Sequence, residues 1–459
     1  MGIPTVTVTR EGFAPVLANA FAGMGFPAEA SMAVYPLEMF IPGSDLSPIE
    51  KKMDELITGL TKWKPKMEGK KVIKPPKIIV EGKDYEDAVV NVNNLFLRNM
   101  WSEGLPITPP TEGRVNWLLT GTDLPRDKVV AKMLPRGGIV TVETIAVNLA
   151  MAGGRPEYMP VLIAAIEAIG APESVHHRMN STTCSVYPVV VVNGPAAKQI
   201  RVGSGYGCLG PDPRHPAGAS IGRAIRFLLQ GAGGAIPAIG TMSIFGGPAR
   251  YTNIVFAEDE DNLPADWEPL SVEQGFPKGS NTVTTYTVAS STNIVGGEAG
   301  DKQSALITLN LAASFMSIPN NNYFYQHTYN PEGAAGILLM AGGTAQGLSR
   351  LGWSKEEVKT YLWENSKVPA SKLARLTQPG ETRSIKLRSV IKDPMPISMS
   401  PKGIKIAVAG GMQSGHMMWL QVGGAPERLV SAEMRFPANW NELLKKAEED
   451  LGLVPIPAK

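Results

Sequence analysis

Both cysteines of this 459-residue chain lie in its most polar stretch, between residues 143 and 223, together with three of its five histidines. Cys184 stands in HHRMNSTTCSVYP, just ahead of an apolar run, and Cys208 stands in the glycine-rich segment VGSGYGCLGPDPRHP. The backbone N–H groups of a glycine-rich loop and a following helix N-terminus favour an anion and lower the pKa of a nearby thiol. The sequence therefore predicts Cys208 as a thiolate or, alternatively, as a buried small hydrophobic side chain. Cys184 is the second candidate thiol. Alternatively, Cys184 and Cys208 form a redox pair.

Groups that could transfer protons accompany these thiols. His176, His177 and His215 are candidates, because one imidazole that titrates near neutrality is sufficient for acid–base catalysis. Glu143 is the candidate catalytic carboxylate, and an ion pair at a helix end is its alternative role. His176 and His177 are adjacent and point apart on regular structure, and the sequence has no HxH or HExxH motif. A zinc site is therefore not predicted.

Glycine-rich turns are the candidate binding elements. Gly205-x-Gly207-x-x-Gly210 matches the dinucleotide-binding fingerprint as a string, but prolines follow where the helix of that fingerprint should begin. We therefore interpret residues 203–210 as a substrate- or anion-binding loop. The candidate substrate-binding residues lie at such turns or at helix ends: Arg155, Glu157, Asn193, Ser204, Gly205, Gly207, Arg223 and His416. Arg223 could clamp a carboxylate with two hydrogen bonds, and a structural ion pair is the alternative for Arg155 and Glu157.

Composition narrows the class of protein. Lys and Arg number 44 against 42 Asp and Glu, and this net charge of +2 argues against nucleic-acid binding. No apolar run reaches about 18 residues, and no basic segment precedes an apolar one at the N-terminus. Neither a membrane span nor a secretory signal is therefore predicted. Two cysteines are too few for a disulfide framework, which favours a reducing cytoplasm.

The first part of the chain predicts a small β-α-β fragment. The β-branched run at 3–9 is typical of a strand, residues 12–26 are typical of a helix, and residues 31–40 are typical of a second extended segment. A further helix is predicted at 45–62. Residues 63–83 are rich in lysine and proline and are interpreted as a solvated linker, with a docking strip for an acidic partner as the alternative.

Mixed helices and strands follow, so the predicted fold class is α/β (mixed α+β), with a small truncated β-α-β N-terminal domain and a larger mixed α/β domain. The predicted helices are 84–101, 111–120, 141–152, 156–169, 219–231, 303–316, 332–348, 354–365 and 438–452. The predicted strands are 186–195, 250–257, 281–289 and 404–411. The predicted domains are 1–62, the linker 63–83, a main catalytic or substrate domain at 84–400, and a C-terminal strand-loop-helix segment at 401–459 packed on it.

Several long segments, in fixed order, carry a family resemblance: EGLPITPPTEGRV (103–115), TVETIAVNLAMAGGRPEYMPVLIAAIEA (141–168), GPARYTNIVFAEDED (247–261) and IAVAGGMQSGH (406–416). They resemble the UGSC family of (seleno)proteins, whose first domain is similar to the B subunit of the glycine and proline reductases. In that subunit a U/C-x-x-C motif precedes segments that GIPTVTVT, AVYPLEMF and DLSPIEKKMDEL resemble here. The resemblance implies that the Cys/Sec-Gly-Ser-Cys segment comes from a separate small subunit or that translation begins upstream of Met1.

The resemblance implies a function for the chain. It would be the large subunit of a thiol- or selenol-dependent enzyme that acts on a carbon–heteroatom bond of a small anionic molecule. The cofactor is left open, and thiol or selenol redox chemistry alone is one of the alternatives. The implied assembly is a hetero-oligomer with the small subunit, and no nucleic-acid or membrane partner is expected. Two alternatives remain open: a cysteine-dependent lyase or hydrolase on a nitrile, amide or thioester, and a non-catalytic binding or scaffold subunit.

Overall fold

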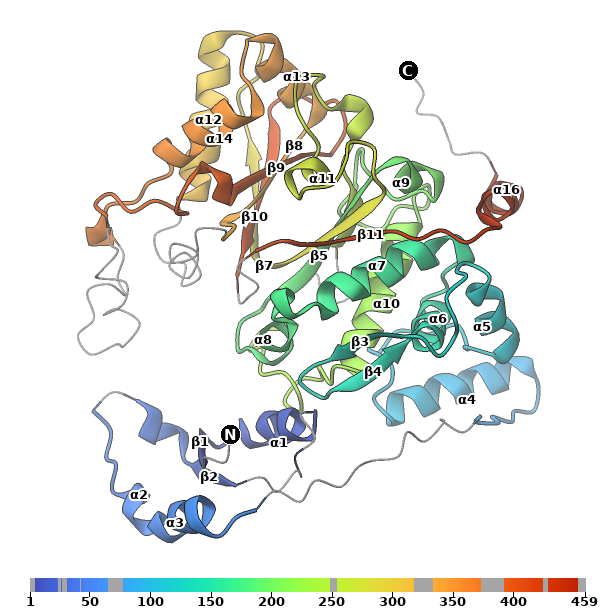
Figure 1. Cartoon of the computed structure of the whole chain (residues 1–459), viewed down its shortest axis with the longest axis vertical. Coiled ribbons are helices and arrows are strands. Elements are labelled where there is room, and N and C mark those ends of the chain that lie inside the picture. Colours follow the sequence, from blue (N-terminus) through green and yellow to red (C-terminus); the bar gives the residue numbers. More distant parts are fainter. Residues whose placement is uncertain are drawn as a thin grey trace.

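Seven strands form one mixed sheet at the centre of the larger part of the molecule (Figure 1). The computed structural model describes residues 5–23, 26, 31–41, 43–64, 77–247, 254–317, 333–372, 392–423 and 428–452. The strands of the sheet are β5 (Tyr187–Asn193), β6 (Ile254–Ala257), β7 (Thr282–Val295), β8 (Gly336–Met340), β9 (Ile404–Val408), β10 (His416–Val422) and β11 (Val430–Glu433). The predicted α/β class is confirmed. No helix in the described ranges is long and apolar enough to cross a membrane.

The two halves of this sheet repeat one arrangement. The strand order is β6-β5-β7-β10-β8-β9, with β11 beside β7. β5 and β6 are parallel, as are β8 and β9, whereas β7 and β10 run antiparallel to their neighbours and to each other. Each parallel pair is joined by a crossover that contains two helices, α9 and α10 in the first half and α13 and α14 in the second. The β7–β10 pair is therefore the centre of a two-fold repeat.

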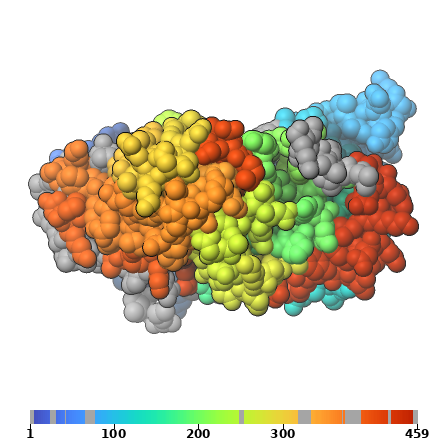
Figure 2. Space-filling model, turned by 90° about the horizontal axis from the view of Figure 1, so that it is seen from above, coloured from blue at the N-terminus to red at the C-terminus, as the bar shows by residue number. Residues whose placement is uncertain are grey.

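Helices cover one face of the sheet in two groups. All helices described in the larger part, on whichever face they lie, are α4 (Tyr85–Arg98), α5 (Glu112–Leu119), α6 (Val142–Met151), α7 (Met159–Gly170), α8 (His176–Ser181), α9 (Pro195–Gln199), α10 (Ala217–Gly231), α11 (Leu270–Glu273), α12 (Lys302–Met316), α13 (Gly342–Arg350), α14 (Lys355–Asn365) and α16 (Trp440–Leu451). α6, α7 and α10 share a core with the first half, and α12, α13 and α14 share one with the second. α4 has no fully buried residue and projects from one end (Figure 2).

The opposite face of the sheet carries a third apolar cluster, to which strands of both halves contribute. β5 is buried along its whole length, because its valines face the helices on one side and this third cluster on the other. Its two ends are therefore the only places where β5 can present a side chain to a ligand.

The sheet curls until its two edge strands meet. Just after β6, the backbone N–H of Asp259 donates a hydrogen bond of 2.8 Å to the carbonyl of Val408, the last residue of β9. The backbone N–H of Gly342, just after β8, donates to the carbonyl of Gly411 at 2.7 Å, which brings the end of β8 to the same place. The carboxyl ends of both parallel pairs thus lie together, although the two pairs run in opposite directions.

The N-terminal part contains a separate two-stranded sheet. β1 (Thr7–Arg10) and β2 (Met32–Tyr35) pair in parallel around α1 (Ala14–Gly23), as the predicted β-α-β fragment requires. The predicted helix at 45–62 is interrupted at Lys52 into α2 (Pro48–Lys51) and α3 (Met53–Thr61). α1 contacts the larger part, because a Cβ on Gly23 would lie 1.7 Å from the carbonyl oxygen of Pro135.

Some predicted elements differ from the structure. The helix predicted at 332–348 is wrong over Gly336–Met340, which form β8, and the helix there begins only at Gly342. A short buried apolar run does not distinguish a strand from a helix by its periodicity. The strands β10 and β11 and the hairpin of β3 (Val129–Met133) and β4 (Gly138–Thr141) were not predicted. Residues 3–4 and 65–76, which belong to the predicted first strand and linker, lie outside the described residues.

Candidate functional site

The segment 203–216, here called the Cys208 loop, lies where the strand ends meet. The carbonyl of Gly203 accepts a hydrogen bond of 2.9 Å from the backbone N–H of Ala257, the last residue of β6. The carbonyl of Ser204 accepts one of 2.8 Å from Gly410, which follows β9. Ligands of α/β sheets bind beyond the carboxyl ends of the strands, especially where the topology changes direction. The predicted loop residues thus lie at a site that this fold favours for a ligand.

The Cys208 thiol is half-buried against the third apolar cluster. Burial and, to a smaller extent, the nearby Asp259 carboxylate raise the pKa of the thiol to about 12. Backbone N–H groups of Leu209 and Gly410 point at the sulfur and act in the opposite direction, but they do not outweigh burial. The prediction that the loop and the following helix lower the pKa of Cys208 is therefore wrong. α10 begins only at Ala217, and the resting thiol is protonated at neutral pH.

His215 belongs to the same loop as this thiol and is held by a carboxylate. Its Nδ1 lies 2.8 Å from Oδ2 of Asp212, and Arg214 also pairs with that carboxylate at 3.1 Å. Hydrogen bonds from Arg214 and His215 lower the pKa of Asp212, so this side chain is an anion at neutral pH. The Cβ atoms of His215 and Cys208 both lie within 4 Å of the position that a Cβ on Gly203 would occupy. The loop therefore brings together a thiol, an imidazole and a carboxylate.

Asp212 was not among the predicted site residues. The available signal was an Asp three residues before His215, ahead of a proline, where a carboxylate commonly organises a turn. The backbone N–H of Arg214 indeed donates to Asp212 Oδ1 at 3.0 Å, and that of His215 donates to the Asp212 carbonyl at 3.0 Å. This turn returns the chain toward Gly203, which the Cβ of Cys208 also approaches.

A buried carboxylate, Glu258, joins the ends of the strands. It accepts hydrogen bonds of 2.7 Å from Asn193 Nδ2 and from the backbone N–H of Leu270. Burial raises the pKa of Glu258. Asn193 Nδ2 also donates a hydrogen bond of 2.8 Å to Glu260, so this amide nitrogen binds two carboxylates of the chain itself. The sequence had predicted Asn193 as a substrate-binding residue. Glu258 was not among the predicted site residues, although a run of acidic residues directly after a buried strand is a sequence signal for such a group.

Two further residues lie at the exposed side of the loop. Tyr206 is 63% exposed, and its ring lies against Gly411, where a Cβ would be 3.1 Å from the ring carbons. Gly411 has a φ of +82°, which favours glycine at this turn. His416, a predicted binding residue, is exposed at the start of β10, and its carbonyl accepts a hydrogen bond from Ala341 after β8. It therefore lies at the same end of the sheet as the Cys208 loop.

Cys184 lies at the opposite end of β5. It precedes the first residue of that strand, Tyr187, whereas Cys208 lies beside segments that follow the carboxyl ends of β6 and β9. A seven-residue strand spans roughly 20 Å. A disulfide needs Cα atoms within about 7 Å, so the suggested redox pair of Cys184 and Cys208 is wrong. Cys184 packs at the border of the first core, and its carbonyl accepts a hydrogen bond from Ser243.

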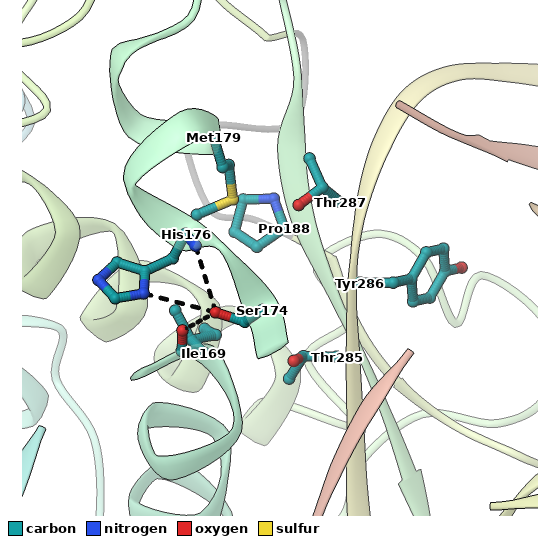
Figure 3. Close-up of a pocket in the computed structure, with 8 residues that line it drawn as sticks. All are labelled: Ile169, Ser174, His176, Met179, Pro188, Thr285, Tyr286 and Thr287. Carbon is teal, nitrogen blue, oxygen red and sulfur yellow. Dashed lines mark hydrogen bonds between the residues drawn. The ribbon is translucent and has the colours of Figure 1, made fainter. Parts of the chain in front are cut away.

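His176, at the start of α8, forms hydrogen bonds within the protein. Its Nε2 accepts a hydrogen bond of 2.9 Å from the backbone N–H of Leu134, and its Nδ1 faces the Ser174 hydroxyl (Figure 3). Burial lowers the pKa of His176 to about 4, so the ring is neutral at neutral pH. It borders a small pocket lined by Ile169, Ser174, Met179, Pro188, Thr285, Tyr286 and Thr287. The adjacent His177 is exposed on α8.

The remaining predicted residues form ion pairs away from the Cys208 loop. Glu143 pairs with Arg126 at the surface at 2.5 Å. Arg155 pairs with Glu157 and with Asp450, and so attaches α16 to the larger part.

Arg223 pairs with the buried Glu103 at 2.9 Å and donates to the carbonyl of Pro106 at 2.8 Å. The guanidinium that was predicted to clamp a substrate carboxylate is therefore already held by a carboxylate of the chain itself.

Comparison with known proteins adds no assignment: no family model, no curated protein and no solved structure matches the chain. Among the described residues, no group of three or more His, Cys, Asp or Glu side chains could hold a metal ion. The case for a function therefore depends on the geometry of the Cys208 loop and on that of the opposite end of β5.

Proposed function

We propose that this chain is a cysteine-dependent enzyme that cleaves a carbon–heteroatom bond of a small molecule, with Cys208 as the nucleophile. The observation that carries the proposal is the association of Cys208, His215 and Asp212 in one loop at the joined strand ends. A nucleophile, a base and a group that orients the base are the arrangement that covalent catalysis requires. Perturbed pKa values of Cys208, Glu258 and Asp212 in one place support a functional site.

The arrangement accounts for each proton. Asp212 holds Nδ1 of His215, which leaves Nε2 to accept the proton of the Cys208 thiol as the sulfur attacks an electrophilic carbon. A sulfur–carbon bond forms, the carbon–heteroatom bond breaks, and His215 returns the proton to the leaving heteroatom. Water then cleaves the covalent intermediate and restores the thiol. The N–H groups of Leu209 and Gly410 stabilise the negative charge that develops at the sulfur.

A second candidate function follows from the N-terminal sheet. Parallel sheets of two strands are rarely stable alone, and this one leaves Val8, Leu37 and Phe40 about half exposed. The N-terminal sheet lies nearer to Cys184 than to Cys208. Gly12 approaches Met242, and the next residue, Ser243, donates a hydrogen bond to the Cys184 carbonyl.

The UGSC resemblance implies a Cys/Sec-Gly-Ser-Cys segment next to this sheet, which in this second proposal belongs to a small subunit. In this second reading the chain is the large subunit of a thiol- or selenol-dependent enzyme, and the thiol on the partner's side is Cys184.

The test compares two variants of the full chain, Cys208→Ser and Cys184→Ser. Each is incubated with p-nitrophenyl acetate without reductant, and the acetylated residue is located by mass spectrometry. The first function predicts acetylation and p-nitrophenol release that disappear in Cys208→Ser and persist in Cys184→Ser. The opposite result favours the split enzyme, and acetylation of neither thiol overturns the proposal for Cys208.

A further inference from the structure

Helix α4 has apolar side chains on two sides but packs against the protein with only one of them. Val92 and Phe96 contact the small apolar cluster around Phe227 of α10. On the outer side, Val90 is 55% exposed and Leu97 is 46% exposed, and the helix projects from one end of the molecule (Figure 2). A helix that is apolar all round is usually buried all round. The outer side of α4 is therefore a candidate interaction surface.

The outer face of α4, defined here as Glu86, Val90, Asn94, Leu97 and Arg98, carries charge only at its ends. These residues follow the helical spacing of three, four or seven positions, and all five are exposed. The acid lies in the first turn of the helix and the base in its last turn, with two apolar side chains and one amide between them. Within the described ranges, no ion pair engages either charge. An apolar centre with a charged rim is typical of a protein–protein interface.

Both ends of this helix are fixed to the protein. Asp84 caps the first turn by accepting a hydrogen bond of 2.9 Å from the backbone N–H of Asp87. Just beyond the last turn, Gln230 of α10 donates hydrogen bonds to the carbonyls of Met100 and Ser102 at 2.9 and 3.0 Å. A surface that is ordered before it binds loses little conformational entropy on association. The outer face of α4 is thus presented in a form that is ready to bind.

We propose that two copies of this chain associate through the outer face of α4, with the two helices packed antiparallel across a two-fold axis. Val90 of each copy then lies opposite Leu97 of the other, and Glu86 lies within one helical turn of the other copy's Arg98. The face is therefore complementary to itself, because each charged end meets the opposite charge of the second copy. A parallel pairing would instead place like charges side by side. The inference is independent of the proposed activity.

Sedimentation velocity of the full chain over the micromolar range tests the association, because small interfaces dissociate at such concentrations. We expect a reversible equilibrium between monomer and dimer. Leu97→Lys should weaken dimerisation at least about tenfold, because the two-fold axis places the new lysine in the contact twice. Leu306→Lys is the matched control, because Leu306 is a leucine of α12 with a similar exposure of 40%, and its replacement should leave dimerisation unchanged. A chain that remains monomeric throughout overturns the proposal.

Charge reversal tests the antiparallel arrangement. Glu86→Arg brings two arginines together at each contact and Arg98→Glu brings two glutamates together, so each variant alone should dimerise at least about tenfold more weakly than the wild type. A mixture of the two variants has an attractive pair at both contacts and should form a heterodimer with nearly the wild-type affinity. Both residues are exposed, and circular dichroism checks that each variant is folded. A dimer that neither substitution weakens, or a mixture that does not associate, overturns the proposal.

Discussion

Replacing His176 with Gln should make the protein less sensitive to acid. In the folded chain burial lowers the pKa of His176 to about 4 from an ordinary value of 6.5. Between these two values the unfolded chain binds a proton that the folded chain does not, so stability falls as the pH falls through this window. A gap of this size corresponds to about 3 kcal/mol of unfolding free energy, lost between pH 7 and pH 4.

The assay is urea unfolding at pH 7, 6, 5 and 4.5, followed by circular dichroism. Gln keeps an acceptor for the backbone N–H of Leu134 and does not titrate, so the His176→Gln variant should lose about 2.5 kcal/mol less than the wild type between pH 7 and pH 4.5. His177→Gln is the comparison variant on the same helix: partial burial also lowers the pKa of His177, and its charge contributes to lowering the pKa of His176, but burial of His176 is the larger cause, so this substitution should change the slope less than His176→Gln. If the free energy of unfolding falls equally with pH in the wild type and in His176→Gln, His176 is not the cause of the acid sensitivity.

Three further changes have defined outcomes. Asp212→Asn should slow acetylation of Cys208 at least about tenfold at pH 7, because His215 loses the anion that holds its Nδ1, and Asp212→Glu should restore part of the rate. Glu258→Ala should lower the free energy of unfolding by about 2–6 kcal/mol in urea, since two buried donors lose their acceptor. Arg223→Ala should lower the free energy of unfolding by about 3–5 kcal/mol, because the buried Glu103 loses its cationic partner. The acetylation rate of the protein that remains folded should not change.

Local sequence patterns predicted most helices and the loop that carries Cys208. The helix at 354–365, for example, begins with Ser354 and Glu357, which form a capping box in the structure. The prolines of the Cys208 loop predicted that no helix begins directly after Gly210, and α10 begins only at Ala217. Such features depend on residues close together in the chain.

The closure of the sheet, the pKa of Cys208 and the separation of the two cysteines depend on contacts between distant segments and were not predicted from the sequence. The hydrogen bond from Asp259 to Val408, which closes the sheet, joins segments about 150 residues apart, and no periodicity encodes it. The pKa of Cys208 was predicted in the wrong direction because burial against the third apolar cluster, which depends on both halves of the sheet, outweighs the local N–H groups. The separation of Cys184 from Cys208 likewise follows from the course of β5.

Activation of Cys208 by His215 is tested by the pH dependence of Cys208 acetylation. The rate is measured from pH 6 to pH 10 in the wild type and in His215→Gln. A thiol with a pKa of about 12 that reacts unaided gains about tenfold per pH unit across this range. We predict this steep profile for His215→Gln, and for the wild type a rate at least about tenfold higher at pH 7 that converges with the variant toward pH 10. Identical pH profiles of Cys208 acetylation in the wild type and in His215→Gln would show that His215 does not activate Cys208.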